Sequence, residues 1–367
     1  MHHFIFPKQD SWISSGSSTI DGESFKDQNF GRDQILEVKK EFYNNKFHHQ
    51  TRALVQFSGT EFTELSKSVA DGSITNPKYY LRLYEIEGNS TLSNEYTLAI
   101  QPISESWVEG IGKNADNPKT TDGCSWENRS NPYGGSEVTW VNNGVTVLSV
   151  SSSNQTFSNQ STDIEVEVTD MVNGWLNNKY GNYGMLIRFS GSQETNETTF
   201  AQLKFFSRNT HTIYQPKLEV RWDDSSFDSG ITSSLTQLTM SGLVDNHLYI
   251  KGLRESYKEN ERVKFRIGAK KKYIQRTFTE ALHISSGSFI PIGSGSYAIK
   301  DVATNEFIVP FSDYTSISYD SNSNYFNQWL DGFYPDRVYK ILLKLKTNDS
   351  QEQIFDNDFE FIVKRNI

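Results

Sequence analysis

The chain has 367 residues, more than one hydrophobic core normally serves, and this length indicates two domains. Its formal net charge of -9 disfavours a nucleic acid partner, because a polyanion would be repelled. A single cysteine, Cys124, excludes an intramolecular disulfide and a thiolate metal cluster. No apolar run approaches the length of a membrane span and no export signal is visible, so we expect neither a membrane partner nor secretion.

Short runs in which apolar and polar residues alternate predict β-strands. In chain order, the apolar members of these runs are Ala53, Val55 and Phe57; Tyr79, Leu81 and Leu83; Ile164, Val166 and Val168; Met185, Ile187 and Phe189; and Leu218, Val220 and Trp222. The residues between them, such as Glu165 and Glu219, are polar, so we expect each strand to have one core face and one solvent face. This pattern is typical of an all-β sandwich.

Two passages between these runs are predicted to be short helices. In the first, Leu65 and Val69 fall at helical spacing ahead of Gly72, which is well placed to end the helix. In the second, Thr169 is expected to cap a helix whose apolar stripe includes Trp175. We expect both helices to cover open ends of a sandwich.

A polar, small-residue stretch over 225–234 has no periodicity and predicts a linker. The domains expected on either side are 1–224 and 235–367. Strands resume beyond the linker at 247–253, 262–267, 297–302, 339–345 and 359–363. These strands suffice for a second, smaller β-sandwich.

Five motifs of the first domain carry a family resemblance. They are the stretches 52–57, 81–84, 106–110 with 125–129, 168–176 and 215–220. In order and spacing they resemble the DNRLRE family of jelly-roll modules, which is related to carbohydrate-binding modules. The resemblance implies an N-terminal jelly-roll β-sandwich with short helices.

Three longer phrases, at 101–107, 205–214 and 353–361, are similar to virion structural proteins of tailed, mostly marine, bacteriophages. In those proteins a jelly roll is followed by an immunoglobulin-like domain. The resemblance implies a non-enzymatic virion component of the neck, collar or tail, assembled in the host cytoplasm with other virion proteins and copies of itself. A glycan-binding decoration or adsorption module is the alternative, and a glycan-cleaving enzyme is a remote one.

Large aromatic residues are the candidates for binding. Trp140 and Tyr133 are of a type that stacks on sugar rings, and Trp140 lies in a Gly- and Asn-rich loop. Trp107 and Trp126 are expected to pack inside the sandwich instead. Subunit contacts are expected at aromatics crowded into one loop-rich stretch, namely Tyr314, Tyr319, Tyr325, Phe326 and Trp329. The alternative is that this stretch folds back over its own domain.

Catalytic and metal sites are not expected. Glu105, Glu109 and Glu127 could supply a carboxylate pair, but an acidic chain offers many such pairs by chance. The run Asp320–Asn324 imitates the start of a calcium loop, yet Tyr325 stands where that loop needs glycine. We therefore expect no cofactor and no metal.

Overall fold

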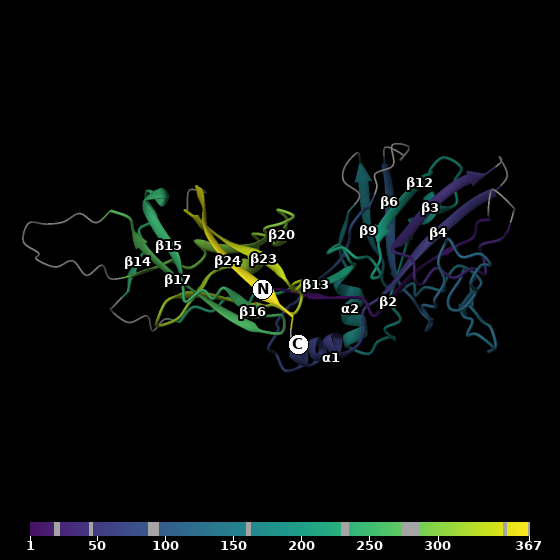
Figure 1. The fold of residues 1–367 in the computed structure, drawn as a ribbon, viewed down its shortest axis with the longest axis horizontal. Helices are drawn as coiled ribbons and strands as arrows, with labels where there is room; N and C mark the ends of the chain where they lie inside the picture. Colours follow the sequence, from purple (N-terminus) through teal and green to yellow (C-terminus); the bar gives the residue numbers. More distant parts are fainter. Residues whose placement is uncertain are drawn as a thin grey trace, which may run out of the picture. The chain divides into compact units, whose positions relative to one another are not determined.

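The computed structural model describes residues 1–17, 23–43, 47–86, 95–158, 163–228, 235–273, 287–347 and 351–365, and these form two compact units (Figure 1). The N-terminal unit consists of Phe4–Ser73 and Lys78–Val220. The C-terminal unit consists of Arg221–Ile367 together with Met1–His3 and Ile74–Pro77. The first three residues of the chain thus belong to the unit that the end of the chain builds.

The described part of the chain is mostly β-strand, which confirms the all-β fold class. One sheet has four strands in the order β1 (His2–Ile5), β13 (Lys217–Arg221), β5 (Lys78–Leu83) and β10 (Ile164–Glu167). A second, seven-stranded sheet runs β12 (Ala201–Phe206), β3 (Ile35–Tyr43), β4 (Phe47–Gln56), β11 (Met185–Phe189), β6 (Glu95–Pro102) and β9 (Ser153–Ser158), with β2 (Gln9–Ser14) paired to β4. A small ribbon joins β7 (Asn128–Ser130) to β8 (Val138–Thr139).

Both predicted helices are present, as α1 (Thr60–Ala70) and α2 (Thr169–Leu176). The cap of α2 differs from the prediction. Val168 occupies the N-cap position, while the Thr169 hydroxyl donates to Glu167 at 2.8 Å and accepts from the Tyr79 amide at 3.1 Å. The hydroxyl therefore ties the start of α2 to β5 instead of capping the helix. Among the described residues, no helix is long and apolar enough to cross a membrane.

The apolar members of the alternating runs are buried, as predicted, from Ala53 to Trp222. The expectation of a solvent face on every strand is wrong at two places. Glu219 of β13 is fully buried, with an oxygen 3.3 Å from the Arg82 guanidinium. Leu54 of β4 and Leu186 of β11 are also fully buried, because another part of the chain covers them.

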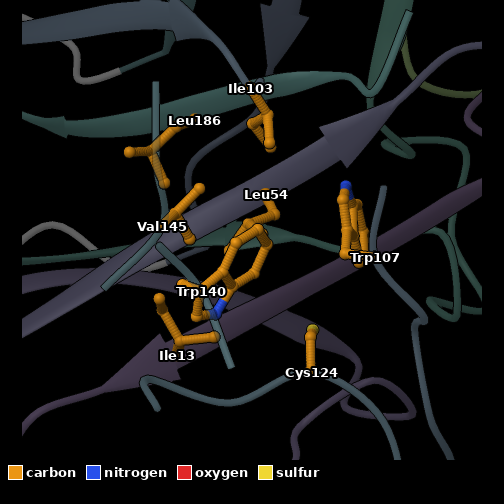
Figure 2. Packing of buried hydrophobic residues seen from close by; sticks show 8 residues of the cluster. All are labelled: Ile13, Leu54, Ile103, Trp107, Cys124, Trp140, Val145 and Leu186. Carbon is orange, nitrogen blue, oxygen red and sulfur yellow. The ribbon is translucent and has the colours of Figure 1, made fainter. Parts of the chain in front are cut away.

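That part of the chain, which we call the cover segment, is 103–147. It contributes Trp107, Cys124 and Trp140 to a packed cluster with strand residues of β2, β4 and β11 (Figure 2). The whole cluster consists of Ile13, Leu54, Ile103, Trp107, Cys124, Trp140, Val145 and Leu186. Full burial raises the pKa of the Cys124 thiol to about 12, so the thiol stays protonated.

A buried asparagine fixes the cover segment to the rest of the unit. The Asn29 side chain is fully buried and donates to the carbonyl oxygens of Glu109 and Cys124, both at 2.7 Å. Its own carbonyl oxygen accepts from the Gly112 amide at 2.8 Å. A side chain on Gly110, where φ is +81°, would collide with this amide, since a Cβ would lie 2.4 Å from Asn29 Oδ1. The cover segment is therefore held by specific hydrogen bonds at close approach.

The C-terminal unit also has two main sheets. One runs β14 (Thr236–Gln237), β18 (Ser288–Phe289), β17 (Arg262–Lys271), β22 (Asn324–Trp329) and β21 (Ser318–Tyr319), with β15 (Asn246–Lys251) paired to β17. The other runs β16 (Ser256–Lys258), β24 (Glu352–Lys364), β23 (Arg337–Lys346), β19 (Gly295–Asp301) and β20 (Phe307–Val309).

Three 3-10 turns complete the described elements of the two units. The N-terminal unit contains η1 (Gly191–Glu194), and the C-terminal unit contains η2 (Leu243–Asp245) and η3 (Asp313–Thr315).

Part of the predicted linker is described, and it is attached to the C-terminal unit. The Ser226 amide donates to Ser318 Oγ at 3.1 Å, and Phe227 forms a β-bridge with Tyr319. Residues 229–234 of the predicted linker lie outside the described residues.

Candidate functional site

A groove of about 400 Å³ lies on the seven-stranded sheet of the N-terminal unit. It is lined by alternate residues of four strands, because directly paired residues point to the same side of a sheet. Gln202 of β12 pairs with Lys39 of β3, Lys39 pairs with Thr51 of β4, and Thr51 pairs with Ser14 of β2. This row of polar side chains crosses the sheet along the groove floor.

Two further pairs extend the polar floor on either side of that row. Lys204 of β12 lies opposite Glu37 of β3, and Glu41 of β3 lies opposite His49 of β4. The side chains interact: Gln202 donates to Glu37 at 2.6 Å, while Glu41 lies 2.9 Å from the Lys39 ammonium and 3.5 Å from His49 Nδ1. The groove therefore contains amide, hydroxyl, ammonium and carboxyl groups in one array.

Burial changes the chemistry of one of these carboxyl groups. Glu37 is 8 % exposed, and desolvation raises its pKa above the ordinary value, although Lys39, Gln202 and Lys204 all favour the ionised form. Whenever such a carboxyl group is protonated, it can donate as well as accept a hydrogen bond.

One end of the groove is aromatic. Trp12 and Phe25 line it there, together with Asn114 of the cover segment. The Trp12 ring is 4 % exposed, stacks on Phe30 at a centroid distance of 3.7 Å, and donates its indole N–H to Asp33 at 2.9 Å. Both faces of the indole are thus largely covered, and Trp12 shapes the groove wall without offering a free ring face.

The groove could not be predicted from the sequence. A single strand shows only that Glu37, Lys39 and Glu41 alternate with the buried Leu36 and Val38. That alternation is the signal that the sequence carries, and it is common to solvent-facing strands. The site is created by the register of four strands, and one of them, β12, is far from the other three in the chain.

The predicted binding residues fall in different environments. Trp107 is 5 % exposed and donates its indole N–H to the Tyr183 carbonyl at 2.8 Å, so its predicted packing role is confirmed. Trp126 is partly buried and packs on the same cluster. Trp140, which we expected to be an exposed ring, is 3 % exposed and donates to the Ser125 carbonyl at 2.9 Å. Its ring packs among Ile13, Leu54 and Val145 (Figure 2), so no face is open to a sugar.

Tyr133 is 97 % exposed, and it lies in the turn between β7 and β8. The turn is closed by a hydrogen bond from the Gly135 amide to the Pro132 carbonyl at 2.8 Å. Tyr133 is therefore available to a ligand or partner, and the structure does not bring it together with Trp140 as a stacking pair.

The predicted interface aromatics do not form an exposed patch. Phe326 is 2 % exposed and stacks on Tyr297 at 3.8 Å, and Tyr325 is 9 % exposed beneath the Lys264 ammonium. Tyr314, Tyr319 and Trp329 are half-buried. The stretch belongs mainly to β21 and β22 of a sheet, so it covers its own unit, as the alternative held.

Two of the acidic residues considered for catalysis, Glu105 and Glu109, form hydrogen bonds within the fold. Glu109 accepts from the Asp10 amide at 3.1 Å and from Arg208 at 3.2 Å, and Glu105 accepts from the Val141 amide at 3.2 Å. Beside Glu109, Asp10 is 1 % exposed and accepts from the Arg208 amide at 2.6 Å. Desolvation, with a smaller contribution from Glu109, raises the pKa of Asp10 to about 8.

The calcium-loop imitation at Asp320–Asn324 is a turn between β21 and β22. Both carboxylate oxygens of Asp320 lie 3.0 Å from the Arg266 guanidinium, which holds the pKa of Asp320 well below its usual range. Asn324 is buried and exchanges hydrogen bonds with the Ile290 backbone at 2.7 and 3.1 Å. These side chains act within the fold.

No protein-family model matches the chain, and the search of curated proteins also gave no match. Among solved structures, the chain is similar to a β-glucuronidase from Parabacteroides merdae, with glycerol in its active site. That likeness has a TM-score of 0.15 and 12 % identity, and covers 76 % of this chain and 28 % of the glucuronidase chain. The chain spans little more than a quarter of the glucuronidase, and a likeness this weak carries no argument about function.

Proposed function

We propose that the chain is a non-enzymatic structural component of a tailed bacteriophage virion, in its neck, collar or tail. It acts through protein–protein contacts with other virion proteins and with copies of itself. Its N-terminal unit serves as a jelly-roll module and its C-terminal unit as an immunoglobulin-like module. The resemblance of the motifs at 101–107, 205–214 and 353–361 supports this proposal.

The structural observation that supports contact with neighbours is a set of exposed apolar side chains on and next to the cover segment. These are Val108 (47 % exposed), Ile111 (61 %), Tyr133 (97 %), Val138 (37 %), Val141 (77 %) and Val150 (55 %). Exposed apolar side chains in such a group are typical of protein–protein interaction sites.

Backbone contacts with β7 bring two of these residues, Val108 and Val138, close together. The Val108 amide donates to the Arg129 carbonyl at 3.0 Å, and Val138 pairs with Ser130, the next residue of β7. The cluster below, with Trp107 and Trp140, makes a rigid support. We define the contact patch as Val108, Tyr133, Val138 and Val141.

Replacing Tyr133 and Val141 with Ser in the phage genome tests the proposal. Both side chains are exposed, so we expect a folded protein with an unchanged melting temperature that is lost from purified particles. The matched control is Val244→Ser in the C-terminal unit, where the side chain is 61 % exposed and outside the contact patch. Normal copy number of the double variant in particles would refute the role of the contact patch.

A second function is favoured by the groove. A polar groove that presents amide, hydroxyl and carboxyl groups in one array suits a polyhydroxylated ligand. We propose that the chain also binds cell-surface glycans there, as a decoration or adsorption module. Binding of fluorescent host glycans by the purified chain, and its loss when Thr51 of the groove floor is replaced by Trp, tests this function.

A further inference from the structure

One sheet face of the C-terminal unit carries a row of cations. Alternate residues of a strand point to the same side of the sheet, and so do directly paired residues of neighbouring strands. β17 therefore places Arg262, Lys264, Arg266 and Lys270 on one face, where they alternate with buried residues. Lys251 of β15, which is paired with Arg266, lies on the same face. We call these five residues the basic strip.

The basic strip is long and lies in the interior of its sheet. Alternate residues of a strand are about 6.8 Å apart, so the cations of β17 extend over roughly 27 Å. Lysine is common on edge strands, where it prevents pairing with other chains. β17 is not such a strand, because it pairs with β15, β18 and β22. The charges are therefore displayed on a face that is already part of a formed sheet.

One carboxylate opposes the basic strip. Both oxygens of Asp320 lie 3.0 Å from the Arg266 guanidinium, and one lies 3.6 Å from the Lys264 ammonium. Lys251, Arg262 and Lys270 form no ion pair within the part of the chain that the structure describes. Five cations and one carboxylate leave the strip with an excess of four positive charges. Like charges side by side on a sheet destabilise it, and a bound polyanion would relieve this repulsion.

An aromatic ring is built into the row of cations. Position 268 lies between Arg266 and Lys270 on the same face, and it is a glycine. The Tyr249 side chain, from the paired position on β15, occupies the free space, since a Cβ on Gly268 would lie 2.2 Å from Tyr249 Cζ. His247 stacks on this ring at a centroid distance of 5.8 Å, and the Lys270 ammonium lies 6.0 Å from its centroid. Glycine thus lets a tyrosine ring lie within the strip.

Two other rings on this face already hold a cation. The Arg262 guanidinium lies 5.3 Å from the centroid of Trp329, and the Lys264 ammonium lies 3.8 Å from that of Tyr325. A single-stranded nucleic acid binds by stacking successive bases on successive rings, and this arrangement suits it poorly. A linear acidic polysaccharide carries recurring carboxylate or sulfate groups that cations bind, and its sugar faces can stack on a ring such as Tyr249.

We propose that the basic strip binds a linear acidic polysaccharide. Its anionic groups contact Arg262, Lys264 and Lys270, and one of its sugar rings packs on Tyr249. The inference goes beyond the functions proposed above, because the strip belongs to the C-terminal unit and uses no residue of the groove or of the contact patch. The attraction comes from exposed charges, so binding should weaken strongly with salt.

Calorimetric titration of the full chain with three probes tests the inference. The probes are a sulfated heparin oligosaccharide, a neutral glucose oligomer of the same length, and an oligothymidylate of the same net charge as the heparin. We expect heparin to bind at least about tenfold more tightly than either of the others. If about four cations release counterions, its affinity should fall about 50-fold when the salt rises from about 50 to about 200 mM.

Matched variants test the place of binding. Arg262→Gln combined with Lys270→Gln should weaken heparin binding about tenfold, since both cations are exposed and without an ion-pair partner among the described residues. Lys270→Arg keeps the charge and should bind as the wild-type chain does. The control combines Lys258→Gln with Lys346→Gln, which removes the same charge from exposed positions of the other sheet and should leave binding unchanged. The melting temperature of each variant reports whether it is folded.

The ring has its own test. Tyr249→Ser removes the stacking surface and leaves the cations, so heparin affinity should fall about fivefold while its salt dependence stays the same. A weaker salt dependence in this variant would mean that the cations have been displaced as well, and the stacking role of Tyr249 would be overturned.

The outcomes distinguish this inference from the alternatives. Tighter binding of oligothymidylate than of heparin overturns the polysaccharide class and assigns the strip to nucleic acid. Equal binding of the neutral oligomer overturns the role of charge. An equal loss in the two double variants overturns the placement on the strip. Thr51→Trp in the groove should leave heparin binding unchanged; a loss there would overturn the inference and leave glycan binding in the groove standing.

Discussion

Consecutive residues of β2 lie in two regions of opposite character. Ile13 belongs to the dry cluster beneath the cover segment, and Ser14 lines the groove. On β3 the same contrast separates the buried Lys40 from the groove residue Lys39. The cluster is stabilised by complementary packing and fully satisfied polar groups, whereas the groove places polar side chains where a ligand can reach them. Stability should therefore depend on the first region and binding on the second.

The largest effect is expected from Trp107→Ala, which should lower the free energy of unfolding by about 3–5 kcal/mol. The substitution empties a site in the cluster and leaves the Tyr183 carbonyl without its indole donor. Denaturant unfolding of the purified chain measures the change. Tyr133→Ala, at the exposed turn of the cover segment, is the matched control and should stay within about 0.5 kcal/mol of wild type. Equal stability of both variants would contradict the structural role of the cluster.

The two neighbouring lysines give a paired test. Lys40 is 1 % exposed, and its ammonium donates to the Gln193 carbonyl at 2.8 Å and to Asn196 Oδ1 at 3.0 Å. Lys40→Met removes the ammonium donor from the Gln193 carbonyl, and leaves Asn196 Oδ1 with only the Thr198 and Thr199 amides, so we expect a loss of about 3 kcal/mol. Lys39→Met changes a groove side chain and should cost less than about 0.5 kcal/mol. The reverse order of the two effects would show that the structure has assigned the lysines to the wrong faces.

Much of the fold follows from the sequence because strand alternation is local. The burial of Ala53 and Val55 on β4 needs only their spacing of two residues. The burial of Leu54 between them could not be predicted, because it depends on a cover segment without periodicity that lies about 50 residues farther along the chain. The same limit explains Trp140: its loop composition suggests exposure, and only tertiary packing buries it.

The groove was not predictable for a related reason. Lys39, Thr51 and Gln202 become one site only through the pairing of β12, β3 and β4. Polar alternation indicates a solvent-facing strand, but it does not reveal which strands are neighbours or where the sheet is hollowed. The predicted residues Tyr133 and Trp140 were selected by residue type, which does not fix exposure.

The pH dependence of stability should follow the buried carboxyl group of Asp10 on β2. Asp10 has a pKa of about 8 in the folded chain against an ordinary value of 3.8, so the folded state binds the proton more tightly. The stability that this proton confers is fully present below about pH 4 and is lost as the pH rises towards 8. Desolvation raises the pKa of Glu109, and Arg208 lowers it by a smaller amount. The net shift is upward, so Glu109 changes the stability with pH in the same direction as Asp10.

Between about pH 5 and pH 8 we expect the wild-type chain to lose stability through Asp10 with a slope of up to about 1.4 kcal/mol per pH unit, and Asp10→Asn to lose little. Thermal unfolding across that range measures the slope. Asp170→Asn, at an exposed position in the first turn of α2, should keep the wild-type slope. An unchanged slope in Asp10→Asn would mean that another group binds the proton.

The smallest effect is expected from the groove itself, at the ion pair between Glu41 and Lys39. The two charges are 2.9 Å apart, but the side chains are 41 % and 20 % exposed, so water and salt weaken their attraction. Glu41→Gln should change the free energy of unfolding by less than about 0.5 kcal/mol, and a double-mutant cycle with Lys39→Met should give a coupling of similar size. Raising the salt to about 0.5 M should reduce the coupling further. A salt-insensitive coupling above about 1 kcal/mol would show that the groove charges hold the sheet together, and they would then not be available for a ligand. A coupling near zero means that Lys39 can leave the Glu41 carboxylate and turn towards a ligand in the groove at little energetic cost.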